Sequence, residues 1–170
     1  MKKVVLMIIP ALICGVVFTS CGSNVLLTES PKSTSTNFAD HQGQLPWPTE
    51  KGVITGHYGK QTHPNFTGVT VDNKGVYIQT PAQSNARSVF DGTVIQNVSL
   101  IEDNYAILVL HDEYITVYAN LTEVYVKAGD KIKAKQAVGK IHTDADNKTE
   151  LNFQIWKGTN PLNPEEWLVN

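Results

Sequence analysis

The stretch that decides the fold is NKGVYIQTPAQSNARSVFDG, residues 73–92. It holds two short strand signals on either side of a polar connection that contains Pro81, and it ends in Asp91-Gly92, a tight-turn pair. A third strand signal, residues 93–95, follows at once. Strands and turns in such close succession favour a β-structure without long helices.

Strand signals continue along the chain on both sides of this stretch. They are short β-branched, aromatic or apolar runs bounded by turn residues, at 69–71, 93–100, 105–110, 114–118, 124–126, 131–133, 137–141 and 152–156. Only residues 163–167 resemble a helix start, with Asn163 as the cap and Pro164 in the first turn. We therefore predict one all-β domain, a sandwich or barrel, over residues 45–170.

The first 20 residues have the pattern of an export signal. Lys2 and Lys3 give a positive start, and an almost wholly apolar segment follows from Val4 to Val17, too short for a transmembrane helix. Cys21 comes directly after this segment and resembles a bacterial lipoprotein processing site. We expect Cys21 to be lipidated; the alternative is an ordinary signal peptide cut near Ser20.

Residues 21–44 are rich in Ser, Thr and Asn and lack periodicity, which predicts a lipidated N-terminus followed by a flexible linker. Once the signal is removed, Cys21 is the only cysteine left, so a disulfide framework and a thiolate metal site are excluded. Subtracting the charges of Lys2 and Lys3 from the net charge of −2 gives about −4. This mild acidity does not support nucleic-acid binding.

Residues 126–139 have a turn-and-strand pattern of their own. A Gly129-Asp130 turn precedes one short strand, and a polar turn precedes another that ends at Gly139. The pattern resembles the hammerhead repeat of lipoyl and biotinyl domains and of lysostaphin-type peptidases. The turn lacks the Met-Lys-Met arrangement of a carrier domain, so a swinging-arm function is not expected.

Residues 47–168 as a whole resemble the LytM or lysostaphin-type zinc endopeptidase domain, whose members cut peptide cross-links in bacterial peptidoglycan. The resemblance rests on the order and spacing of several landmarks: Trp47-Pro48 with Tyr58-Gly59, Gly75-Val76 with Pro81 and Asp91-Gly92, Leu110-His111 with Tyr118-Ala119 and Leu121, residues 126–139, and Leu151 with Phe153. It implies a barrel-sandwich fold, a duplicated hybrid motif of short antiparallel strands. The closest resemblance is to the non-enzymatic EnvC-like and NlpD-like murein hydrolase activators.

The zinc site of that family does not carry over to this chain. The resemblance places the two first zinc ligands, His and Asp, on Asn73 and Tyr77, and the catalytic histidine of a Tyr-Ala-His-Leu segment on Asn120. It places the His-x-His pair on Glu150 and Asn152. Neutral Asn and Tyr are poor zinc ligands, and Asn cannot act as a general base. We therefore expect neither metal, cofactor nor catalytic residues.

The histidines of the chain do not suggest a replacement site. No pair has the i, i+2 or i, i+4 spacing of local ligands; the five residues are His41, His57, His63, His111 and His142. We expect exposed or structural roles for them.

The residues at the five lost positions would instead line a groove that binds a partner. The resemblance implies a regulatory helix of a zinc-dependent N-acetylmuramoyl-L-alanine amidase, with activation of that enzyme in cell separation or wall remodelling. Glu150, the only acid of the set, would favour a basic partner segment. Three alternatives remain: a peptidoglycan-binding module, an endopeptidase with an unrecognised site, or a solvated relic. We expect a lipid-anchored protein that faces the periplasm of a Gram-negative cell.

Overall fold

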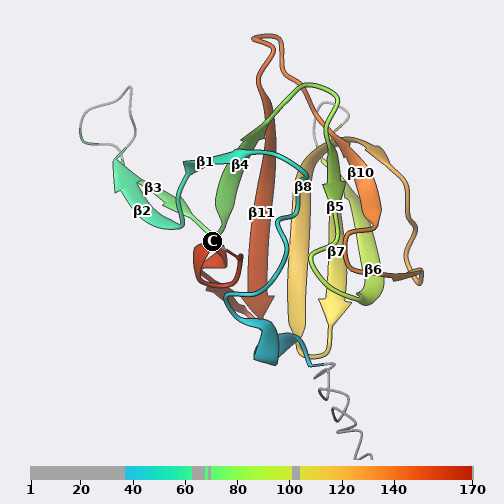
Figure 1. Ribbon diagram of the computed structural model, residues 1–170. Helices are drawn as coiled ribbons and strands as arrows, with labels where there is room; N and C mark the ends of the chain where they lie inside the picture. The colour runs from blue at the N-terminus through green and yellow to red at the C-terminus, as the bar shows by residue number, and fades with distance from the viewer. Residues whose placement is uncertain (1–36, 63–67, 69, 101–103, 170) are drawn as a thin grey trace, which may run out of the picture. The chain divides into compact units, whose positions relative to one another are not determined.

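The computed structural model describes residues 37–62, 68, 70–100 and 104–169 (Figure 1). The expected export signal, Cys21 and the first part of the expected linker lie outside these residues, so their predictions stand untested.

Strands make up nearly all of the regular structure. They are β1 (Val53–Gly56), β2 (Gly59–Thr62), β3 (Thr70–Asn73), β4 (Val76–Thr80), β5 (Asn85–Arg87), β6 (Gly92–Ser99), β7 (Tyr105–His111), β8 (Tyr114–Val124), β9 (Lys131–Ile132), β10 (Ala137–Ile141), β11 (Thr149–Lys157) and β12 (Asn160–Leu162). Two 3₁₀-helices, η1 (Phe38–His41) and η2 (Pro164–Glu166), are the only helices of the described residues. None of the helices in that part of the chain has the length and apolarity needed to cross a bilayer. The prediction of an all-β fold is confirmed.

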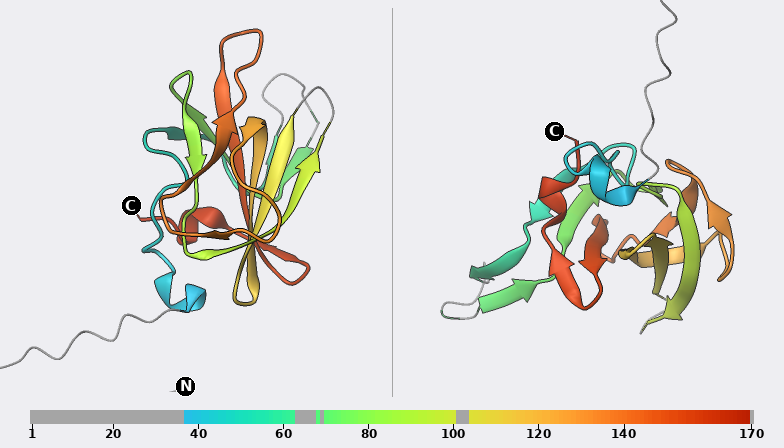
Figure 2. Two further views of the ribbon diagram at one scale, coloured as in Figure 1. Left: turned by 90° about the vertical axis from the view of Figure 1, so that its right-hand side faces the viewer. Right: turned by 90° about the horizontal axis from the view of Figure 1, so that it is seen from below.

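The strands form one large antiparallel sheet and one small hairpin. The large sheet has the order β1-β4-β11-β8-β7-β6-β9, while β10 pairs with β5 and β8, and β12 pairs with β11. The hairpin β2–β3 projects from the side of the domain (Figure 1). Seen from below, the strands curve around a common core instead of forming a flat layer (Figure 2). Curvature of this kind follows from the twist that every strand carries.

A period of two separates the core face of the sheet from its outer face. In β11, Leu151, Phe153 and Ile155 are fully buried, and the residues between them are half-buried. In β4, Val76 and Ile78 are fully buried in the same way. Because successive side chains of a strand point to opposite faces, one face of each strand closes the core and the other remains available for binding.

Strand β8 is longer than the sequence predicts. It runs through 11 residues, whereas we expected one strand at 114–118 and a second at 124–126. Residues 114–119 pair with β11, and residues 121–124 pair with β10. One strand therefore changes its neighbour at Asn120, which has a left-handed backbone with φ of 68°.

The domain begins earlier than the expected boundary at Leu45. Phe38 is fully buried, and its ring stacks on His111 and Trp167 with centroid distances of 4.9 and 5.1 Å. Its backbone N–H donates to the carboxylate of Asp112 at 3.1 Å. The expected linker therefore ends before η1. Sequence analysis did not identify Phe38 as a core residue, because its neighbours in the chain are polar and a single aromatic residue gives no periodic signal.

His111 belongs to a buried chain of hydrogen bonds. Its Nδ1 lies 2.8 Å from the carbonyl oxygen of Asp91, which can only accept, so Nδ1 carries the proton. Nε2 lies 2.8 Å from Thr116 Oγ1 and accepts from that hydroxyl. Gly92 leaves the space for this ring, since a Cβ there would lie 2.5 Å from His111 Nδ1. The role of His111 is structural.

Truncation of Phe38 tests whether η1 is part of the domain. We expect Phe38→Ala to lower the free energy of unfolding by about 3–5 kcal/mol, because it leaves a cavity between two aromatic rings. Urea unfolding followed by tryptophan fluorescence measures the loss. Phe38→Leu, which keeps an apolar side chain, should cost clearly less. Equal stability of Phe38→Ala and the parent would place η1 outside the cooperative unit.

Acid should destabilise the domain through His111. Burial lowers the pKa of His111 below its ordinary value of 6.5, although the carbonyl of Asp91 opposes this shift. The unfolded chain therefore binds this proton more readily, and the free energy of unfolding falls as the pH drops below about 6.5. One proton gives a slope of at most about 1.4 kcal/mol per pH unit. Urea unfolding between pH 5 and pH 8 measures it.

In His111→Gln, the free energy of unfolding should depend less steeply on pH below pH 6.5. The steeper dependence should persist in His142→Gln, which alters a histidine outside the core. An unchanged slope in His111→Gln would assign the pH dependence to other groups.

Candidate functional site

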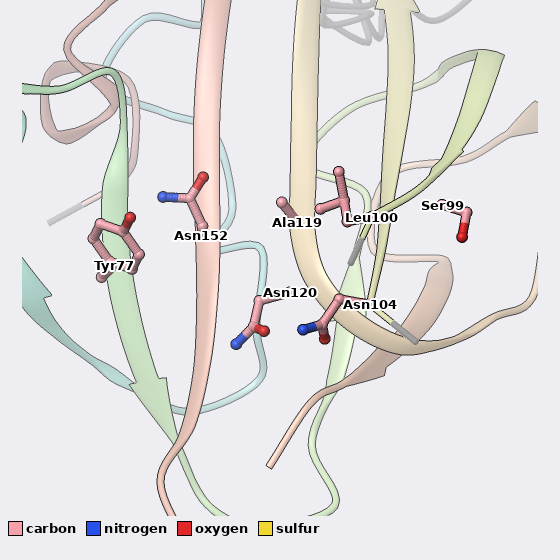
Figure 3. A pocket seen from close by; sticks show the side chains of 7 residues that line it. All are labelled: Tyr77, Ser99, Leu100, Asn104, Ala119, Asn120 and Asn152. Carbon is pink, nitrogen blue, oxygen red and sulfur yellow. The ribbon is translucent and has the colours of Figure 1, made fainter. Parts of the chain in front are cut away.

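Three of the five residues singled out by the sequence line one hollow on the outer face of the sheet. Tyr77 of β4 and Asn152 of β11 are direct cross-strand partners, and Asn120 of β8 lies beyond them. The hollow measures about 860 Å³. Its other lining residues are Ser99, Leu100, Asn104 and Ala119. Figure 3 shows Asn152 between Tyr77 on one side and Ala119 on the other.

The change of partner at Asn120 opens this hollow. Ala119 is the last residue of β8 that pairs with β11, opposite Asn152. Beyond it, β8 turns to β10, so the backbone of Glu150 faces no strand on that side. The carboxamide of Asn120 fills the gap, because its Nδ2 donates to the carbonyl oxygen of Glu150 at 2.6 Å. A side chain thus replaces the ladder hydrogen bond at the floor of the hollow.

Tyr77 stands at the edge of the hollow with 36% of its surface exposed. Its ring lies against Gly56 of β1, where a Cβ would come within 2.8 Å of Tyr77 Cδ2. The missing side chain of Gly56 therefore lets the aromatic ring lie flat beside the strand. This position gives an apolar surface and a hydroxyl group to any ligand of the hollow.

Glu150 lies beside the hollow but does not offer a free carboxylate. Lys148 Nζ is 3.0 Å from its Oε1, and the hydroxyl of Thr55 donates to the same oxygen. Only 18% of the Glu150 side chain is exposed. The expectation that this acid favours a basic partner therefore loses its physical basis, because Lys148 already compensates the charge.

Asn73, the fifth residue, lies outside the lining of the hollow. It is the last residue of β3, and its Nδ2 donates to the carbonyl oxygen of His57 at 3.0 Å. His57 Nδ1 lies 3.0 Å from the carboxylate of Glu165 in η2. Asn73 thus holds the base of the β2–β3 hairpin, and its described contact is structural.

Sequence reasoning missed Ser99, Leu100 and Asn104. They come from the end of β6 and from the connection to β7, and they reach the hollow only because β6 pairs with β7 and β7 pairs with β8. No motif marks them in the sequence. Asn104 Oδ1 is buried and has no hydrogen-bond partner among the described residues. An unsatisfied buried acceptor of this kind is costly unless a ligand or water engages it.

The lining of the hollow suits hydrogen bonding to neutral groups better than it suits metal chemistry. It offers three carboxamides, a phenol and a hydroxyl group, together with apolar Leu100 and Ala119. In the described part of the chain, no group of three or more His, Cys, Asp or Glu residues could hold a metal ion. The zinc ion implied by the resemblance does not fit Asn73, Tyr77 and Asn152, since these side chains are poor ligands for it.

Comparison with known proteins gives the same picture of the fold. The profile of Peptidase family M23 matches residues 71–164. An uncharacterized protein of Neisseria meningitidis serogroup B is 33% identical over 132 residues, 77% of this chain and 21% of that protein. The murein hydrolase activator NlpD of Salmonella dublin is 26% identical over 140 residues, 79% of this chain and 35% of that protein. The chain thus spans about a third or less of these relatives' lengths.

Among solved structures, a zinc-containing peptidase from Vibrio cholerae superposes with a TM-score of 0.63 at 24% identity. The match covers 76% of this chain and 41% of the peptidase. The predicted LytM-like architecture is confirmed by this likeness of fold.

Substitution of Asn120 tests its double role in the sheet. We expect Asn120→Ala to cost about 1–3 kcal/mol, because the carbonyl oxygen of Glu150 loses its hydrogen bond and alanine tolerates positive φ less readily than asparagine. Asn120→Gly should cost less, since glycine accepts the same backbone conformation. Thermal and urea unfolding compare the variants.

Asn147 provides a matched control, because it has a φ of 60° but lies exposed in a turn. Asn147→Gly should be nearly neutral, whereas Asn120→Gly should lose the hydrogen bond to Glu150. Equal effects at the two positions would mean that the Asn120 carboxamide contributes nothing to the sheet.

Proposed function

This chain belongs to peptidase family M23, and from that premise we propose that it is a non-catalytic member that binds and activates a cell-wall amidase. The observation that carries the proposal is the composition of the hollow. It lies where the family resemblance places the zinc site, yet Tyr77, Asn120 and Asn152 line it. The hollow remains open and keeps unused hydrogen-bonding groups. Such a site can bind without cutting.

Apolar side chains on the outer face of the sheet support the proposal that the partner is a protein. Apolar residues continue from the hollow along β8 and β7, where Val117 is opposite Leu108 and Ile115 is opposite Leu110. Trp156 of β11 is opposite Ile115. These side chains are exposed or half-buried, and cross-strand partners lie on the same face. An amphipathic segment could place its apolar side on this band and its polar groups in the hollow.

The relatives support the same role. NlpD of Salmonella dublin is named a murein hydrolase activator, and its similarity to this chain extends over 140 residues, 79% of the chain. In our proposal, the hollow binds the segment of the amidase that blocks its active site. Activation follows if the hollow binds the withdrawn segment more tightly than the blocking one, because the ligand then shifts the population of amidase states.

We also propose that the protein is attached to a membrane through lipidated Cys21 and faces the periplasm. The apolar segment before Cys21 supports this location. The amidase would then meet the domain close to the cell wall.

A peptidoglycan-binding module is the second candidate. The carboxamide-rich lining favours it, because wall peptides also present neutral amide groups. It differs from the first proposal in one respect: the protein would be retained by purified sacculi in the absence of any protein partner.

Replacement of Tyr77 or Asn152 by alanine should abolish activation and preserve the fold. Residues 22–170, mixed with a zinc amidase of the same organism, should release dye from labelled peptidoglycan above the level of the amidase alone. We expect Tyr77→Ala to weaken amidase binding by about tenfold or more, since truncated aromatic anchors commonly cost at least 1.4 kcal/mol. Fluorescence anisotropy measures the affinity.

Glu123→Ala serves as the control, because Glu123 pairs with Lys140 on the β10 side of β8. It should activate like the parent. Activation that survives both Tyr77→Ala and Asn152→Ala would contradict the role of the hollow. Dye release by the protein without an amidase would reveal an active site and overturn the proposal of a non-catalytic member.

A further inference from the structure

Three polar side chains on the outer face of β11 form a continuous relay. Trp156 Nε1–H donates to Gln154 Oε1 at 2.8 Å, and Gln154 Nε2–H donates to Asn152 Oδ1 at 2.7 Å. The three residues are spaced by two, so the strand places them on one face. The relay leads from half-buried Trp156 into the hollow and ends at Asn152.

The chemistry of the indole fixes the direction of the whole relay. An indole N–H can only donate, so the oxygen of Gln154 must face Trp156. The amino group of Gln154 must then face Asn152, where the carboxamide oxygen accepts it. The amino group of Asn152 is left without a partner among the described residues, and it is available to the hollow (Figure 3).

Packing holds the middle of the relay in place. A Cβ at Gly75 would lie 2.5 Å from Gln154 Cγ, so the missing side chain of Gly75 provides the space for Gln154. Trp156 is the cross-strand partner of Ile115 on β8 and of Pro161 on β12. Strand β11 is therefore held by a neighbouring strand on each side at this residue. Asn152 therefore presents its donor from a pre-organised position, and little side-chain entropy is lost on binding.

The charges around the hollow decide which acceptor suits this donor. No Lys, Arg, Asp or Glu lines the hollow in the described part of the chain, and the nearby carboxylate of Glu150 is paired with Lys148. A buried carboxylate ligand would lack a cation, and a guanidinium ligand would lack a free anion. A neutral carbonyl group avoids both costs. Asn104 adds a further uncharged carboxamide to the same lining.

We propose that the hollow recognises the neutral peptide backbone of its protein partner, and that the Trp156–Gln154 relay sets this specificity by directing the Asn152 amino group at a partner carbonyl. Trp156 and Gln154 are positioning residues that act through Asn152. The inference rests on the proposed function for the identity of the partner, while the recognition of peptide groups depends on the hollow alone.

The test uses the full chain in detergent micelles with ¹⁵N-labelled side-chain amides. The probe is acetyl-alanyl-alanine N-methylamide, which carries only neutral peptide groups, and sodium acetate and guanidinium chloride are the charged comparisons. We expect the neutral peptide to shift the amino-group resonances of Asn152, and neither ion to do so at the same concentration. Tighter binding of acetate or guanidinium would overturn the proposal.

Two variants separate positioning from general stability. Gln154→Met and Trp156→Phe should each weaken binding of the neutral peptide about fivefold or more, because Asn152 loses its fixed orientation. The double variant should bind no more weakly than Gln154→Met, since both changes interrupt one relay. The control Gln96→Met alters an exposed glutamine of β6 and should bind like the parent. Thermal unfolding of every variant checks the fold.

The relay would be contradicted if Gln154→Met and Trp156→Phe both bind the neutral peptide like the parent. It would also be contradicted if their losses of binding free energy add fully in the double variant. The probe experiment contains no amidase, so its outcome is separate from that of the activation assay. If the protein binds the neutral peptide through Asn152 but does not activate an amidase, the result supports the relay and contradicts the proposed function. Amidase activation that is unchanged in Gln154→Met would contradict recognition of the amidase through the relay and leave the proposed activator function intact.

To identify the source of the peptide group, amidase affinity is measured in Gln154→Met, which leaves the apolar band with Trp156 unchanged. A matching loss of amidase affinity assigns the recognised backbone to the protein partner. Loss of sacculus binding with unchanged amidase affinity would assign it to wall peptides and overturn the choice of a protein.

Discussion

The exchange of neighbours by β8 at Asn120 is the constraint on which the outer face of this domain depends. A single residue with positive φ allows β8 to pair with β11 first and with β10 afterwards. The carbonyl group that β11 leaves unpaired at Glu150 is satisfied by the Asn120 side chain. The hollow is therefore a consequence of the backbone geometry. Asparagine suits this position because it combines tolerance of the left-handed region with a donor of the right length.

Local patterns predicted the fold well wherever one face of a strand packs on the core. The alternation in β4 and β11 follows directly from a period of two, and the cap of η2 at Asn163 is where the sequence suggested it. The full length of β8 could not be predicted, because its second half is stabilised by β10, a partner distant in sequence. Phe38 was missed for a related reason: its neighbours in the core, His111 and Trp167, come from the other end of the chain.

The candidate site was predicted in part. Register alone brings Tyr77 and Asn152 together, and the family resemblance located Asn120 beside them. The contacts of Glu150 were predictable only in part: Lys148 is two residues away, but Thr55 reaches the same carboxylate from β1, which is distant in sequence. The motif positions in the sequence therefore indicated where the candidate site lies. The contacts of each side chain in the structure indicate which ligands suit it.

The attachment of η1 has a mechanical consequence for β8. Phe38 packs on Tyr114, the first residue of β8, and bonds to Asp112 in the preceding turn. Asn120 lies six residues further along β8, so the hollow is about 20 Å from this anchoring point. A force applied to the chain ahead of Phe38 would thus act on the end of β8 that is remote from the hollow.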